Sequence, residues 1–234
     1  MEIWAHRGCS FRHPENTLES FEAAAKLPGL TGIELDVQLA KDGVPVVIHD
    51  EKLDRTTTMV GYVKDWAFTE YEKYTKIPSL EQVLTLLKPY MDKGLLLNIE
   101  LKNSEIRYEG MEQKVMDMVS NFGLEDKVIY SSFNSDSTKL IKEMNPAANV
   151  ACLGEDIIDC MNDCNFKVHG DAVHPYIRKV NLPLFALEGT KVRVWTKDPL
   201  FPHEHFMREH DLKKLESKGI AGIFLNNPED YLKV

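Results

Sequence analysis

The sequence has few cysteines, and they follow no binding pattern. Only four occur among 234 residues: Cys9, Cys152, Cys160 and Cys164. Cys160 and Cys164 would lie one turn apart on a helix, but no second cysteine or histidine pair accompanies them at the spacing of a zinc site. A disulfide scaffold is therefore excluded, and we expect reduced thiols of the kind found in the cytosol.

Long apolar runs are also absent. No stretch approaches the roughly 18 uninterrupted apolar residues that a membrane-spanning helix needs. The first residues, MEIWAHRGCS, lack the basic region followed by an apolar run that marks a secretory signal. We therefore expect a soluble, cytoplasmic protein with no stable membrane association.

Positive charge is in deficit. The chain carries 28 Lys and Arg against 37 Asp and Glu, a net charge of −9. This argues against a broad polyphosphate-binding surface and hence against a nucleic-acid partner. Hydrophobic residues make up 43% of the chain, enough for a sizeable core. Because no linker divides the chain, residues 1–234 are predicted to form one domain; the oligomeric state cannot be inferred from the sequence.

Short apolar runs alternate with amphipathic segments along the whole chain. Eight of these runs are candidate strands, at residues 3–6, 32–37, 95–101, 128–133, 149–153, 172–176, 192–196 and 222–225. Helical periodicity between them predicts helices, at residues 18–25, 80–87, 115–122 and about 204–218. Ser79 and Gln82 form a capping-box pair, and Gly219 would end the last helix.

The alternation of strands and helices predicts the fold class. Parallel strands joined by helical crossovers follow from it, and eight repeats in 234 residues suit an α/β protein with a (β/α)₈ TIM barrel. A doubly wound sheet is the competing fold. The first candidate strand is followed by HRGCSFRHPENT rather than by a GxGxxG turn, which favours the barrel.

An insertion follows the second candidate strand, at about residues 43–78. It begins after the turn signal AKDG, which predicts a β-hairpin. The hairpin would return His49 and Asp50 to the end of the second strand. The remainder, about residues 51–78, is expected to form a loop over one face of the barrel.

Acidic side chains share one face of two neighbouring strands. Because side chains alternate along a strand, Glu34 and Asp36 point the same way, and Glu100 and Lys102 do so in the next strand. Three converging carboxylates are unfavourable unless a proton, a basic partner or a metal compensates them. Their hard oxygen ligands favour Mg²⁺ or Ca²⁺ over zinc. A salt-bridge network that includes Lys102 and Arg7 is the alternative.

Two histidines are expected at the same mouth of the barrel. His6 and Arg7 come at the end of the first strand, where TIM barrels carry catalytic groups, and the hairpin would deliver His49. Histidine exchanges protons near neutral pH, and arginine binds anions bidentately. Together with a metal, these residues suit in-line displacement at phosphorus.

Several segments resemble the motifs of one known family. WAHRGCSFRHPENTLESFEAA, GIELDVQLAKDGVPVVIHDEKLDRTT and NIELK closely resemble the glycerophosphodiester phosphodiesterase family, with weaker similarity in VRVWTK and GIFLNNPED. The resemblance runs from about residue 3 to residue 231. The sequence departs from the family at Leu225, where threonine is common, and at His13, where a small residue is usual. We expect His13 to be a solvated loop histidine.

The resemblance implies the fold and the central residues of the site. The family fold is a TIM barrel with a small insertion after the second strand. His6 and His49 would be the paired general acid and general base. The implied metal ligands are Glu34, Asp36 and Glu100.

Further positions match the family outside this centre. Arg7 and Lys102 match residues that bind the phosphate. Trp195 matches an aromatic residue that could cover the glycerol, with a position in the core as the alternative. Glu15 and Asn16 are expected to turn the chain into the first helix.

The other histidines receive weaker expectations. His174, in the sixth strand, could line the mouth. His203, His205 and His210 have a spacing that is poor for a metal site, so we expect them on a solvated face.

The resemblance predicts metal-dependent hydrolysis of a small-molecule glycerophosphodiester to sn-glycerol 3-phosphate and an alcohol, through a cyclic phosphate. The nearest alternative is a lysophospholipase D-like or cyclic-phosphate-forming member of the same superfamily. A protein that binds phosphoesters without turnover is a third hypothesis, because a fold alone does not define a function.

Overall fold

The computed structural model describes residues 1–201 and 209–232. Its strands are β1 (Glu2–His6), β2 (Gly32–Leu39), β3 (Pro45–Val47), β4 (Leu96–Leu101), β5 (Val128–Ser132), β6 (Asn149–Gly154), β7 (Ala172–Pro175), β8 (Arg193–Val194) and β9 (Gly222–Leu225). The α-helices are α1 (Leu18–Ala25), α2 (Phe68–Tyr74), α3 (Leu80–Met91), α4 (Met111–Asn121), α5 (Ser135–Met144), α6 (Ile157–Asn162) and α7 (Leu212–Glu216). A strand is present at each of the eight predicted places.

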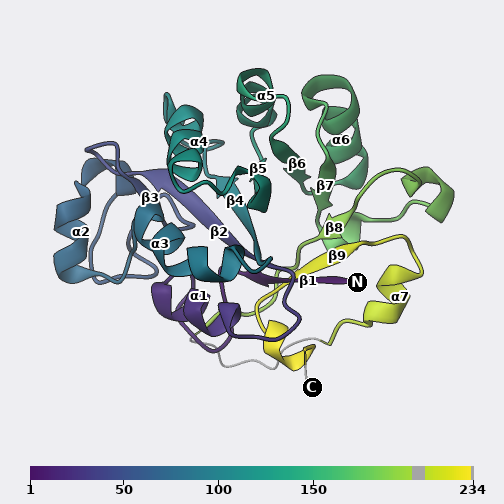
Figure 1. Ribbon diagram of the computed structural model, residues 1–234, viewed down its shortest axis with the longest axis horizontal. Helices are drawn as coiled ribbons and strands as arrows, with labels where there is room; N and C mark the ends of the chain where they lie inside the picture. Colours follow the sequence, from purple (N-terminus) through teal and green to yellow (C-terminus); the bar gives the residue numbers. More distant parts are fainter. Residues whose placement is uncertain (202–208, 233–234) are drawn as a thin grey trace.

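Eight parallel strands form a nearly closed barrel, which confirms the predicted (β/α)₈ fold. Their pairing runs in the order β7-β6-β5-β4-β2-β1-β9-β8. Isolated parallel bridges between Val173 and Val192 and between Tyr176 and Trp195 connect β7 to the region of β8, so that the ring is nearly closed. Figure 1 shows the helices around the outside of the strands. Because the strands are parallel, their carboxyl ends meet at one mouth.

Helices α1 and α3 each begin after a residue that caps the helix. The side chains of Thr17 and Ser79 each accept a hydrogen bond from the backbone N–H three residues later, and both complete a capping box. Such caps satisfy backbone donors that the first turn leaves without a partner. Among the described helices, none combines the length and the apolar character needed to cross a bilayer.

The last helix is shorter than predicted. Helix α7 begins at Leu212 because Asp211 caps it, its side chain accepting a hydrogen bond from the backbone N–H of Lys214. Residues 209–210 are not helical, and residues 202–208 of the predicted helix lie outside the described residues. Gly219 does follow the helix in a left-handed conformation, with φ of 83°, as expected of a residue that ends a helix.

An apolar cluster fills the interior of the barrel. It consists of Trp4, Ile129, Ala151, Ala172 and Phe224, and the rings of Trp4 and Phe224 have centroids 5.6 Å apart. The alternate side chains of the same strands join the larger core beneath the helices. Polar side chains at the carboxyl ends of the strands therefore lie next to an apolar interior, where charges interact more strongly than in water.

The insertion contains more structure than the predicted loop. Its hairpin is confirmed, because β3 pairs antiparallel with β2 and Val47 lies opposite Val37. The remainder carries helix α2 and a turn of 3₁₀ helix, and it packs around an apolar cluster of its own that includes Leu53, Val63 and Tyr71. Burial of these apolar side chains stabilises the ordered conformation of the insertion. It lies at one side of the barrel, beside α3 (Figure 1).

Candidate active site

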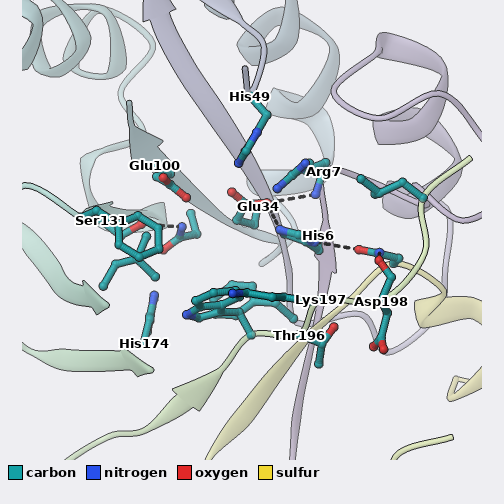
Figure 2. A pocket seen from close by; sticks show the side chains of 17 residues that line it. His6, Arg7, Glu34, His49, Glu100, Ser131, His174, Thr196, Lys197 and Asp198 are labelled. Atoms are coloured by element: carbon teal, nitrogen blue, oxygen red, sulfur yellow. Dashed lines mark hydrogen bonds and ion pairs between the residues drawn. The ribbon is translucent and has the colours of Figure 1, made fainter. Parts of the chain in front are cut away.

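A cavity of about 380 Å³ opens at the carboxyl ends of the barrel strands. Six of the predicted site residues line it: His6, Arg7, Glu34, His49, Glu100 and Trp195. Figure 2 shows His6, His49 and Glu100 gathered around Glu34. The two other predicted residues lie next to this group rather than in the cavity lining: Asp36 is buried, and the side chain of Lys102 is 9% exposed.

The three predicted carboxylates converge. One oxygen from each of Glu34, Asp36 and Glu100 lies within 4.8 Å of the others. Buried cations also reach the cluster, since Arg7 Nε lies 3.2 Å from Asp36 Oδ2 and Lys102 Nζ lies 3.0 Å from Glu100 Oε1. The site therefore combines the geometry of a metal site with part of the salt-bridge network that was its alternative.

The two cations do not compensate the three carboxylates equally. Burial raises the pKa of Glu34 well above its ordinary value, and the charges of Asp36 and Glu100 raise it further. Burial would raise the pKa of Asp36 too, but Arg7, His49, Lys102 and the hydrogen bond from Asn16 together outweigh burial and hold that pKa well below the ordinary range. Among the described residues, Glu34 Oε1 and Asp36 Oδ1 are buried without a hydrogen-bond partner. Negative charge and acceptor oxygens are thus left over for a cation.

The spacing of the carboxylates fits a divalent ion. Ligand oxygens at about 2.1–2.6 Å from one ion lie no more than about 5 Å from each other, and the three carboxylates satisfy this limit. Glu34, Asp36 and Glu100 are therefore the residues that could hold the ion. All three offer oxygen, the donor preferred by Mg²⁺ and Ca²⁺.

A tight turn after β1 places Arg7 against the cluster. Arg7 has φ of 57° and Gly8 has φ of 81°, both in the left-handed region. Gly8 is required for a second reason, because a Cβ there would come within 2.5 Å of Ser20 Oγ. The turn directs the backbone N–H of Arg7 to Glu34 Oε2 at 3.0 Å.

Glu15 and Asn16 do more than turn the chain into α1. Arg7 Nη1 donates a hydrogen bond of 2.8 Å to Glu15 Oε1. Asn16, which also has a left-handed φ of 56°, donates from Nδ2 to Asp36 Oδ2 at 2.8 Å. Both residues therefore hold site side chains in place. The sequence alone predicted only their role in the turn.

His6 is buried at the end of β1. Its Nδ1 lies 2.7 Å from Asn226 Oδ1, and its Nε2 lies 3.8 Å from Glu34 Oε2. Burial lowers the pKa of His6 to about 3, with a further contribution from the charge of Arg7. The ring is therefore neutral at physiological pH, and its Nε2 faces the carboxylate cluster.

His49 is oriented by a chain of charged side chains. Its Nδ1 lies 2.7 Å from Asp50 Oδ1, and Arg55 Nε donates to Asp50 Oδ2 at 2.6 Å. Arg55 also donates through Nη1 to Glu15 Oε2 at 2.6 Å. Because Glu15 accepts from Arg7 as well, the chain connects the insertion to the residues around the carboxylates. Figure 2 shows the His49 ring directed toward Glu34.

Aromatic side chains form another wall of the cavity. Trp195 lies with its ring centroid 4.9 Å from that of Tyr176 and 6.0 Å from that of Phe133, and its Nε1 donates to the Gly154 carbonyl. It therefore lines the cavity and also packs against the apolar cluster of the barrel interior. His174 also lines the cavity, as expected, and burial lowers its pKa well below the ordinary value.

Other expectations are corrected by the structure. His210 was expected on a solvated face, but its side chain is only 7% exposed and its Nε2 lies 2.7 Å from Asp198 Oδ2. His203 and His205 lie outside the described residues. His13 is partly exposed and pairs with Glu19, in agreement with a surface position.

Two residues at the end of the last strand were given no role from the sequence. Leu225 is fully buried in the core. Asn226, the partner of His6, was not predicted from the sequence. Asn226 comes just after β9 and two positions after Phe224. Because side chains two positions apart point to the same side of a strand, this place could have indicated it.

A parallel barrel with two histidines, an acidic cluster and buried cations at its mouth is the arrangement of an enzyme that acts on an anionic substrate. The model of the glycerophosphoryl diester phosphodiesterase family matches residues 6–230. The chain belongs to this family. It is therefore a phosphoric diester hydrolase, of the glycerophosphodiester phosphodiesterase type.

Individual relatives agree with this assignment. The chain is 36% identical to the glycerophosphodiester phosphodiesterase of Bacillus altitudinis, over 100% of this chain and 97% of that protein. It is 34% identical to that of Caldanaerobacter subterraneus, over 99% and 96% of the two chains. Among solved structures, an Oleispira antarctica phosphodiesterase in complex with sn-glycerol-3-phosphate shares the fold with a TM-score of 0.78 at 24% identity, covering 98% of this chain and 94% of that one.

Proposed function

We propose that the chain hydrolyses glycerophosphodiesters to sn-glycerol 3-phosphate and an alcohol, with His6 and His49 as paired acid and base. One observation carries the proposal. Each histidine has Nδ1 within 2.7 Å of a side-chain oxygen, from Asn226 and Asp50 respectively. Nε2 of each ring is then available for proton exchange in the cavity beside the carboxylates.

The metal site is the second element of the proposal. Glu34, Asp36 and Glu100 would hold a divalent ion, Mg²⁺ or Ca²⁺. When bound, such an ion supplies positive charge that polarises a phosphoryl oxygen and orients a substrate hydroxyl. The acceptor oxygens that lack a partner on Glu34 and Asp36 support this assignment.

The side chains would act in two steps. One histidine removes the proton of the glycerol hydroxyl that neighbours the phosphoester. The oxygen of that hydroxyl then forms a bond to phosphorus. The other histidine gives its proton to the alcohol oxygen, whose bond to phosphorus breaks, and a cyclic phosphate forms. In the second step a water molecule opens the ring, and the histidines exchange roles and regain their starting protonation. Arg7 and Lys102 share the phosphoryl charge, and Trp195 covers the glycerol.

Substitution of each histidine tests the proposal. His6→Ala and His49→Ala should each lower kcat for glycerophosphocholine by about 10²–10⁴-fold, because each removes one proton transfer. Their circular dichroism spectra should match the parent. His13→Ala, which changes a partly exposed histidine paired with Glu19, is the matched control and should keep full activity. Turnover close to that of the parent in both variants would sink the mechanism.

Metal removal and product analysis separate the alternatives. EDTA should abolish activity, and added Mg²⁺ or Ca²⁺ should restore it, whereas a purely structural salt-bridge network would be indifferent to the chelator. ³¹P NMR should show sn-glycerol 3-phosphate as the final product. A cyclic phosphate that persists would indicate the cyclic-phosphate-forming activity instead, and binding without turnover in any metal would indicate a non-catalytic protein.

The substrate partner proposed here is a small diester in the cytoplasm. That location stays a prediction, which fractionation of cells would test. Activity recovered only in a membrane or extracellular fraction would contradict it.

A further inference from the structure

A second cavity adjoins the catalytic one. Its volume is about 870 Å³, against about 380 Å³ for the catalytic cavity. It lies between the turn that contains Glu15 and Asn16 and two parts of the insertion, residues 55–58 and 73–77. His49 and Leu200 line both cavities. The two cavities therefore meet at His49 and Leu200.

The ionisable side chains that line the second cavity are mostly basic. Arg55, Lys73 and Lys76 line it together with a single carboxylate, that of Glu15, although the net charge of the chain is −9. Exposed threonine hydroxyls of the insertion stand in the same lining. Local positive charge in a concave surface raises the concentration of anions there.

Two of these cations, Lys73 and Lys76, are accessible to a ligand, whereas Arg55 is already paired. Both Asp50 and Glu15 hold Arg55 through short hydrogen bonds, so its guanidinium is already committed to the protein. Lys73 is exposed, and Lys76 faces Glu19 at 3.5 Å in an exposed ion pair. Exposed pairs of this kind contribute little stability, so a phosphate can compete for Lys76.

We propose that the second cavity binds the alcohol arm of the substrate and that this alcohol carries hydroxyl groups and a phosphate of its own. The inference rests on the proposed function. A phosphodiester has two arms, and with the glycerol arm at the carboxylates the other arm passes His49. A phosphate monoester carries nearly two negative charges at neutral pH, which lysine ammonium groups bind as point charges. The same lysines disfavour a cationic head group such as choline.

A matched pair of substrates tests the inference. Glycerophosphoinositol 4-phosphate and glycerophosphoinositol differ by one phosphate on the alcohol arm. The parent enzyme should show a kcat/KM about tenfold higher for the phosphorylated diester at low salt, and the preference should shrink as salt screens the charges. In K73E/K76E the ratio should fall to one or below. K64E, which reverses a lysine elsewhere in the insertion, should keep the parent ratio.

Two results would overturn the inference: no preference in the parent enzyme, or an unchanged preference in K73E/K76E. A binding measurement keeps it independent of catalysis. Inositol 4-phosphate, the alcohol released from the phosphorylated diester, should bind the parent in calorimetric titration and bind K73E/K76E at least about tenfold more weakly. If neither these two diesters nor glycerophosphocholine is hydrolysed, the proposed function fails, while this titration still decides the second cavity, because equal binding to both proteins refutes the inference.

Discussion

Single residues at this site connect groups that would be unstable alone. Arg7 illustrates the point, because its backbone N–H bonds to Glu34 while its guanidinium contacts Glu15 and Asp36. A buried charge needs such partners, because transfer of the charged group from water into the interior costs several kcal/mol. Ion pairs and hydrogen bonds offset this cost. Glu34 receives the least compensation of the three carboxylates, and it is where the need for a cation is greatest.

The raised pKa of Glu34 predicts that stabilisation by metal depends on pH. In the metal-free protein, Glu34 contributes stability below its ordinary pKa of 4.5 and loses that contribution as the pH rises through its raised folded-state pKa. Mg²⁺ or Ca²⁺ binds the ionised form and must displace the proton at lower pH. The gain in unfolding free energy on adding the metal should therefore be larger at pH 8 than at pH 5.

Thermal denaturation with EDTA or with saturating metal measures this difference. At about 100 times the dissociation constant, a ligand specific for the folded state stabilises it by about 2.7 kcal/mol. Glu34→Gln should lose most of the metal effect and should make the stability of the metal-free protein less sensitive to rising pH. A metal effect of equal size at both pH values would contradict the assignment.

At the scale of elements, the hairpin of β2 and β3 is the device that completes the site. It returns the chain to the end of β2, so that His49 lies beside the side chains of β2. Arg55 then joins this hairpin to the turn before α1, through Asp50 on one side and Glu15 on the other. The insertion is thus connected to the barrel by the same groups that orient His49.

Loss of Arg55 should therefore impair catalysis more than binding. Arg55→Gln should lower kcat for glycerophosphocholine by roughly tenfold to a hundredfold, with a small change in KM, because small misplacements of a catalytic group cost about this much. Arg55→Lys keeps the charge but not the planar fork, so it should recover only part of the rate. Lys64→Gln, in the same insertion, is the control. A change confined to KM would contradict a positioning role for Arg55.

At the scale of the whole molecule, the nearly closed barrel and the insertion have separate apolar clusters. The cluster of the insertion includes Leu53 and Tyr71, whereas the barrel interior is built on Trp4 and Phe224. The antiparallel hairpin and the Arg55 ion pairs join the two parts. We propose that residues 1–234 form one domain, with an insertion at about 43–78.

One domain predicts one unfolding transition. Trp66 lies in the insertion and Trp4 in the barrel interior, so a comparison of the parent with Trp66→Phe isolates the fluorescence of the insertion. Its midpoint in denaturant should coincide with that of far-ultraviolet circular dichroism, as two-state unfolding requires. A fluorescence change of Trp66 that precedes the loss of circular dichroism would show that the insertion unfolds by itself.

Much of the fold and the centre of the site could be predicted from local patterns. Alternation along β2 places Glu34 and Asp36 on one side of the strand whatever the rest of the chain does, and the repeat of strands and helices defines the barrel. Prediction was poorer where local patterns are weak. His210 looked like a surface residue because its partner, Asp198, belongs to a separate segment, and α2 was missed because its anchor, Tyr71, packs on side chains distant in sequence.

The order of the amino acids specifies which chemical groups the site contains and which strand carries each, because side-chain direction on a strand follows from a period of two residues. Which groups meet depends on how the chain folds. Asn226 reaches His6 across 220 positions, and Arg55 reaches Glu15 across 40. Pairing of β9 with β1 brings Asn226 to His6, and the hairpin of β2 and β3 brings Arg55 to Glu15. Burial then makes these polar side chains depend on one another, since charges interact more strongly in a dry interior than in water.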